Sequence, residues 1–265
     1  MKNIYKLILN IAFVLLASSG FAQSSNSSPA QPGAVNRAGE QRMLSQRIAK
    51  LYCQQGLGIL PEQTPTALTE AKNRFEANLK ALKPVVVASR STEALQAYQR
   101  LGTEWTALKR TMRVPVSRDA AVRLVRQAEL TLVAAENLTG VIEDESRSPS
   151  SRVVNIAGRQ RMLSQRIASQ YLLLSWGVES SAVRTRLESA INDFSAGLSR
   201  LTARKDNPPG VQSALSEIAR QWEWLQTSLS LEGASTYALL VAESADSILE
   251  ASDRVTRLYE QAPHN

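Results

Sequence analysis

The sequence contains one cysteine, Cys53, and one histidine, His264, and this scarcity excludes several classes of site. A single cysteine cannot form an intrachain disulfide, and we expect it to be a small buried hydrophobic residue. One thiol and one imidazole cannot build a zinc site, a haem attachment or a Ser/His catalytic arrangement. The sequence therefore predicts no enzyme activity, no catalytic residues, no metal site and no cofactor.

Aromatic residues make up only 5% of the chain, and the formal net charge is a modest +7. This charge falls to about +5 once Lys2 and Lys6 are removed with an N-terminal leader, and the excess is spread along the predicted helices. A nucleic-acid surface usually combines a basic patch with stacking aromatic side chains. The composition therefore predicts no nucleic-acid partner, although it allows a preference for small anions.

The one long apolar run lies at the N-terminus, where Lys2 and Lys6 precede apolar residues 7–17 and the small-residue sequence Gly20-Phe21-Ala22. This pattern is typical of a secretory signal peptide, residues 1–22, cleaved after Ala22. The run is short for a membrane span of roughly 20 residues, so an uncleaved anchor is the weaker alternative. The mature protein is predicted to be soluble and periplasmic.

Residues 23–34 are rich in serine and proline and predict a disordered leader. The prolines beyond it are expected in loops, because proline breaks helix interiors. The stretches between them have the apolar spacing of helices, with no alternating β-branched run. We predict an all-α protein with helices at residues 35–59, 64–83, 91–112, 118–145, 151–178, 181–204, 210–230 and 235–261.

An internal repeat divides the chain. The stretches NRAGEQRMLSQRIAKLY (residues 36–52) and NIAGRQRMLSQRIASQY (residues 155–171) share nine consecutive identical residues at a shift of 119. Trp105 falls on Trp224 at the same shift, whereas the shift becomes 117 in the fourth helix of each half. The repeat predicts two tandem up-down four-helix bundles, at residues 35–147 and 148–265.

The repeated arginines are the candidate binding residues. On a helical wheel Arg42 lies in a strip of small and polar residues, and Arg161 lies in the same strip of the second copy. If two such strips face each other, a planar oxyanion between the guanidinium groups would relieve their repulsion. The predicted anion-binding residues are Arg42, Arg161, Gln46, Gln165, Ser45 and Ser164, with Arg37, Arg47 and Arg166 in support.

Other interpretations of these residues stay open. The alternative interpretation of Arg42 is an ordinary solvated charge that pairs with a surface carboxylate. Arg47 and Arg166 lie at the border of the core face, where an aliphatic stem packs while the head reaches a carboxylate. Trp105 and Trp224 are expected in the core of each third helix rather than in an aromatic cage.

The two quoted stretches resemble the PilJ-type N-terminal domain of type IV pilus chemotaxis transducers, and the related P-box of NarX-type nitrate and nitrite sensors. The resemblance implies a periplasmic four-helix bundle that dimerises. In the nitrate sensors, P-box arginines of two subunits meet around one anion, and Arg42 and Arg161 match that position. The basic residue after the motif asparagine is Arg37 in the first copy but Ile156 in the second, which implies a weaker second site.

Two functions follow as hypotheses. The first is an exported sensor of a small oxyanion, nitrate or nitrite, that passes ligand occupancy to a membrane-bound receptor or transporter component. The second is a helical interaction module of a chemotaxis or pilus-related system with no small ligand. The sequence leaves two arrangements open: the motif copies meet within one chain as a pseudo-dimer, or between the chains of a homodimer.

Overall fold

The computed structural model describes residues 32–230 and 235–262, and this part of the chain is all-α, as predicted. Its helices are α1 (Pro32–Leu57), α2 (Thr64–Ser89), α3 (Thr92–Thr111), α4 (Arg118–Ser146), α5 (Pro149–Ser175), α6 (Ser181–Thr202), α7 (Pro209–Ser230) and α8 (Ser235–Gln261). The predicted signal peptide and nearly all of the predicted leader lie outside the described residues. No helix in the described part is long and apolar enough to cross a membrane.

One proline, Pro84, lies inside a helix, although the sequence analysis expected the prolines in loops. The prediction ended the second helix at residue 83, but α2 continues through Pro84 to Ser89. Pro84 and Lys80 are both exposed, so water can reach the Lys80 carbonyl that loses its helical donor. The helix ends instead at Arg90, which takes a left-handed backbone conformation with φ of 57°.

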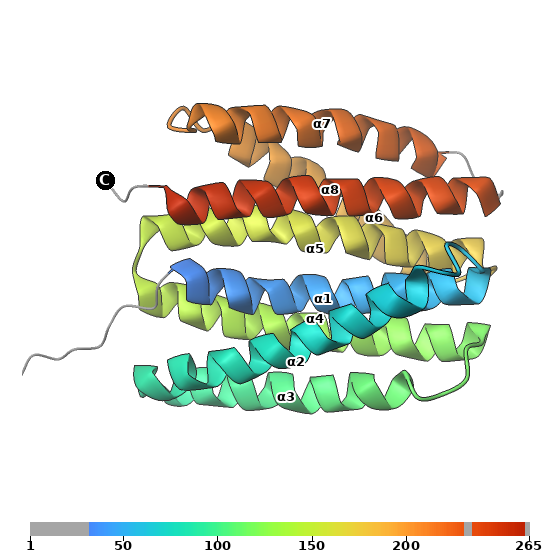
Figure 1. The fold of residues 1–265 in the computed structure, drawn as a ribbon, viewed down its shortest axis with the longest axis horizontal. Coiled ribbons are helices and arrows are strands. Elements are labelled where there is room, and N and C mark those ends of the chain that lie inside the picture. The colour runs from blue at the N-terminus through green and yellow to red at the C-terminus, as the bar shows by residue number, and fades with distance from the viewer. Residues whose placement is uncertain (1–31, 231–234, 263–265) are drawn as a thin grey trace, which may run out of the picture.

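The two halves fold as four-helix bundles that lie side by side. In the first half α1 packs on α2 and α4, and α3 packs on α4 and α2. The same pairings recur among α5, α6, α7 and α8. Figure 1 shows α1 and α5 together in the middle layer, with α2 and α3 on one side of the molecule and α7 above α8 on the other.

An aromatic pair marks the core of each bundle. Phe75 of α2 stacks on Trp105 of α3, with ring centroids 4.0 Å apart, and Phe194 of α6 contacts Trp222 of α7 at 4.3 Å. The predicted match of Trp105 to Trp224 was therefore wrong, since Trp224 is 73% exposed and Trp222 fills the core. The shift of 117 already applies in the third helix, because the chain from Phe194 to Trp222 is two residues shorter than that from Phe75 to Trp105.

Candidate functional site

The two motif helices pack against each other inside a single chain. α1 makes its most extensive contact with α5, and the two run parallel in the centre of the molecule (Figure 1). Nearly every motif side chain is buried, because α1 and α5 are surrounded by α2, α4, α6 and α8 as well as by each other. The intrachain pseudo-dimer is thus the arrangement adopted, and the identical stretches occupy equivalent positions across its pseudo-two-fold axis.

Arg42 and Arg161 meet at this interface. Their exposed fractions are 0% and 1%, so the interpretation of Arg42 as a solvated charge was wrong. A methyl group on Gly158 would lie 3.1 Å from Nη2 of Arg161 and 3.5 Å from Nη2 of Arg42. A methyl group on Gly39 would lie 2.8 Å from Nη2 of Arg42. The motif glycines therefore leave the space in which the two guanidinium groups converge.

Each arginine already has a carboxylate partner from its own half. Nη1 of Arg42 lies 2.7 Å from Oε2 of Glu136 on α4, and Nη1 of Arg161 lies 2.7 Å from Oδ1 of Asp253 on α8. Glu136 and Asp253 are equivalent residues at the shift of 117. Each guanidinium group thus already has a protein counter-charge on its Nη1, while the Nη2 atoms of the two arginines converge near Gly158.

The motif asparagines connect each arginine to the opposite half. Nη2 of Arg161 donates to Oδ1 of Asn36 at 2.7 Å, and Nη2 of Arg42 lies 3.4 Å from the carbonyl of Asn155. The amide of Asn36 donates to Glu260 at 2.7 Å. The amide of Asn155 donates to Glu143, again the equivalent residue. These contacts tie the start of each motif helix to the fourth helix of the other half and to the arginine of the other half.

Burial makes the charge on Arg42 costly. Burial, together with smaller contributions from the nearby cations Arg159 and Arg161, lowers the pKa of the Arg42 guanidinium from 12.5 to about 9. At neutral pH the group is still charged, so it needs an anionic partner inside the protein. Glu136 supplies that charge, and it also pairs with the half-exposed Arg159.

The other predicted anion-binding side chains do not converge on the arginine pair. Gln46 and Gln165 donate to the carbonyls of Ala128 (3.3 Å) and Ala245 (3.0 Å) in their own halves. Ser45 and Ser164 donate to carbonyls one turn back in their own helices, those of Arg42 (2.7 Å) and Arg161 (3.0 Å). Arg37 is exposed on α1. Of the predicted set, only Arg42 and Arg161 come together.

Arg47 and Arg166 act between the halves. Arg47 of α1 pairs with Asp246 of α8 at 2.7 Å, and Arg166 of α5 pairs with Glu129 of α4 at 2.5 Å. Glu129 and Asp246 are again equivalent residues. The interpretation of these arginines as structural cations that reach a carboxylate is confirmed, and the carboxylate in each case belongs to the other half.

Lys50 breaks the pseudo-symmetry, because the equivalent residue is Ser169. Its side chain is fully buried, and Nζ lies 2.6 Å from Oδ1 of Asp246. Burial lowers the pKa of Lys50 from 10.5 to about 8, although Asp246 acts in the opposite direction. The ammonium group is therefore buried at a net cost that Asp246 offsets only in part.

Lys50→Met should change how stability depends on pH. Between pH 8 and 10.5 the folded parent releases the Lys50 proton while its unfolded chain keeps it, so its free energy of unfolding rises with pH. The parent should gain up to about 1.4 kcal/mol per pH unit over the variant in this window. Below pH 8 the cost of burying the charge is fully present. Urea unfolding of both proteins at pH 7, 8, 9 and 10 measures the difference, and parallel curves would show that Lys50 does not titrate there.

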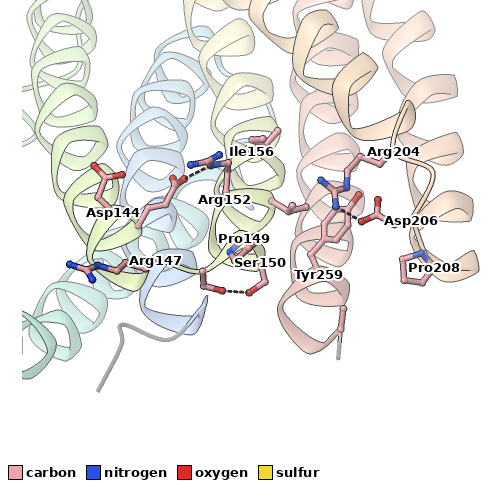
Figure 2. Close-up of a pocket in the computed structure, with 14 residues that line it drawn as sticks. Asp144, Arg147, Pro149, Ser150, Arg152, Ile156, Arg204, Asp206, Pro208 and Tyr259 are labelled. Carbon is pink, nitrogen blue, oxygen red and sulfur yellow. Dashed lines mark hydrogen bonds and ion pairs between the residues drawn. The ribbon is translucent and has the colours of Figure 1, made fainter. Parts of the chain in front are cut away.

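A cleft of about 810 Å³ lies where the two halves join. Figure 2 shows its lining from the junction between α4 and α5, the loop between α6 and α7, and the end of α8. Arg152 pairs there with Glu143 at 3.7 Å, and Arg204 pairs with Asp206 at 2.5 Å. Arg147 points away from both (Figure 2). Arg152 and Arg204 already have carboxylate partners, so this cleft has weaker anion-binding chemistry than its arginine content suggests.

Several site residues escaped the sequence analysis, namely Asn36, Asn155, Gly39, Gly158, Glu136 and Asp253. The asparagines and glycines repeat within the quoted motifs, and the carboxylates repeat at the shift of 117. That shift also pairs Glu129 with Asp246. The recurrence of these acidic residues in the fourth helix of each half was therefore the available signal.

Cys53, as predicted, is a buried hydrophobic residue, and burial raises the pKa of its thiol to about 12. Within the described residues, no three histidine, cysteine or acidic side chains are grouped so as to hold a metal ion.

Comparison with known proteins supports the duplication. The sequence model of the family described as PilJ, type IV pili methyl-accepting chemotaxis transducer N-term, matches twice, at residues 23–131 and 145–252. Searches of curated proteins and of solved structures found no match. The relation to the nitrate-sensor P-box stays a resemblance. The two matches cover most of the chain, one on each half, and the chain therefore belongs to the PilJ N-terminal domain family, of which it carries two copies.

Proposed function

We propose that this chain is an exported helical interaction module of a chemotaxis or pilus-related system, which docks on a membrane-associated signalling component and binds no small ligand. The family is named for the N-terminal domain of chemotaxis transducers, which makes a sensory role the nearest functional class. The described chain has no helix that could span a membrane, so its effect on a transducer would pass through a partner.

The observation that carries this proposal is the state of the buried arginine pair. Arg42 and Arg161 face each other, but Glu136 and Asp253 already neutralise them. A nitrate ion would have to displace a carboxylate from a buried guanidinium and leave that carboxylate without its charge partner. The paired motif is therefore better suited to holding the two halves together than to receiving an ion from solution.

Sensing of nitrate or nitrite is the second candidate function. The convergence of two guanidinium groups against Gly158 favours it, because a planar oxyanion can accept two hydrogen bonds from each of them. In that case Arg42 and Arg161 would bind the ion, and Glu136 and Asp253 would have to turn toward solvent. Both carboxylates are about one-third exposed, which leaves them a path outward.

Docking on a membrane-associated component can be tested at the exposed apolar side chains, which are candidate contact positions. Leu130 and Val133 on α4 are 45% and 67% exposed, and Trp224 on α7 is 73% exposed. A photo-crosslinking residue placed at Leu130 or Trp224 in living cells should give adducts with a membrane-bound chemotaxis or pilus component. Ser213, exposed on the same helix as Trp224, is the matched control position. Equal labelling from all three positions, or labelling of soluble proteins alone, would count against docking.

Export can be tested by intact mass. The leader predicts that the protein recovered from the periplasm begins at Gln23 and lacks residues 1–22. A mass that still includes Met1 would show that the leader is retained, and absence of the protein from the periplasm would show that the proposed localisation is wrong.

A further inference from the structure

Five arginines at one end of the first half have no ion pair within the described part of the chain. They lie in the last turn of α3, in the loop that follows it and in the first turns of α4, and all are exposed: Arg110, Arg113, Arg118, Arg123 and Arg126. Elsewhere the motif cations Arg42, Arg47 and Arg166 each have a carboxylate partner. Other exposed arginines, such as Arg37, Arg200 and Arg220, are distributed along the helices as the sequence analysis expected, and this end adds a local cluster to them.

Apolar side chains protrude among these arginines. Val114 and Val116 in the loop are 40% and 39% exposed, and Val122 on α4 is 39% exposed. Every residue from 113 to 119 is exposed, so the loop forms an exposed tip at this end of the first half. In Figure 1 it lies at the end of the molecule opposite the end of α8. The hydroxyl of Tyr52, on α1, donates to the carbonyl of Val114 at 3.3 Å and ties the tip to the bundle.

The second half shows that the fold does not require this cluster. Residues 109–126 contain six basic residues and one acidic residue, a net charge of +5. The equivalent residues 226–243 contain two glutamates, Glu232 and Glu243, and no basic residue. The same pair of helices is therefore built without arginines in the second copy, so in the first copy they serve something other than folding.

We propose that this basic tip, defined by the five arginines and by Val114, Val116 and Val122, docks on an anionic lipid surface. An exposed loop with apolar side chains at its tip and guanidinium groups beside them matches a membrane interface, where apolar groups enter and cations meet phosphate headgroups. The inference is independent of the proposed function, because it concerns one end of the molecule and requires neither a receptor nor a ligand.

The distribution of the arginines favours a lipid surface over an acidic protein. The arginines are distributed over the end of α3, the following loop and the start of α4. An anionic lipid surface carries negative charge over its whole area, so it can contact all of them at once. Each cation near such a surface adds to the affinity, and the sum is strongly dependent on salt.

Vesicle co-sedimentation tests the proposal with the full mature chain. Vesicles of phosphatidylcholine with about one-third phosphatidylglycerol should bind the protein at low salt, and vesicles of phosphatidylcholine alone should not. The double variant Arg113→Glu/Arg118→Glu should bind the anionic vesicles at least tenfold more weakly, since two cations are lost and two like charges are added. Val114→Ser/Val116→Ser should weaken binding about fivefold, because less apolar surface enters the interface.

The matched control is Arg200→Glu/Arg220→Glu, which makes the same change of net charge at exposed arginines of α6 and α7. It should bind like the parent, and circular dichroism should show that all variants are equally helical. Equal binding to neutral vesicles, absence of binding, or equal loss in the control would overturn the proposal. Binding to soluble polyglutamate as tight as to the anionic vesicles would also overturn it, in favour of an acidic protein partner.

Discussion

Glu136→Ala should lower the free energy of unfolding by about 3–5 kcal/mol, because it leaves a fully buried guanidinium without its counter-charge. Arg42 has no exposed surface, and its remaining hydrogen bonds are weak ones to the carbonyls of Gly39 and Asn155, each at 3.4 Å. Chemical unfolding of the parent and of the variant at pH 7 measures the loss.

Arg159→Ala is the matched control, since Arg159 pairs with the same Glu136 but is half exposed. Its loss should cost less than about 1 kcal/mol, as is usual for surface ion pairs. Asp253→Ala should cost less than Glu136→Ala, because Arg161 keeps a 2.7 Å hydrogen bond to Asn36. Equal, small effects of all three changes would mean that the arginine pair is hydrated and contributes little to the fold.

A chain cut between its two halves should stay in one piece. A specific protease site inserted after Arg147, which is exposed between α4 and α5, would separate the bundles covalently. The halves should still elute together in gel filtration, because α1 packs along α5 and because Arg47–Asp246 and Arg166–Glu129 pair across the interface.

Reversing the charge of both cross-half carboxylates should release the cut halves from each other. Glu129→Arg/Asp246→Arg places like charges against Arg47, Lys50 and Arg166 in a partly buried interface, which is strongly unfavourable. Glu76→Arg, which reverses the partly exposed pair with Lys109 within the first half, is the control and should leave the cut halves together. Separation of the cut parent itself would show that the bundles are independent.

The fold could be predicted from the sequence because the apolar spacing of helices and the placement of prolines between them are local signals. Helices α4, α6 and α8 begin where the spacing predicted, and α8 also ends there. The mismatch at Pro84 arose because an exposed helix face tolerates a proline that a buried one would reject. The wrong pairing of Trp105 with Trp224 arose because a constant shift was assumed, although Phe194 and Trp222 are two residues closer along the chain than Phe75 and Trp105.

The site was predicted only in part, because the sequence identifies which residues repeat and not what faces them. The duplication indicated that Arg42 and Arg161 belong together, and they do converge. Their partners come from α4 and α8, about 90 residues away along the chain, and only the folded structure places Glu136 and Asp253 there. A single helical wheel also cannot show that α1 and α5 are surrounded on all sides, which is why Gln46 and Ser45 were assigned to a gap that they do not line.

The central claim is that protein carboxylates, and not a bound anion, neutralise the paired arginines. Thermal unfolding of the parent protein in nitrate, nitrite and chloride at equal ionic strength tests it most directly. The account predicts the same midpoint in all three salts. Stabilisation by nitrate or nitrite approaching the roughly 2.7 kcal/mol expected at 100 times a dissociation constant, and lost in Arg42→Ala and in Arg161→Ala, would contradict it and establish the anion sensor instead.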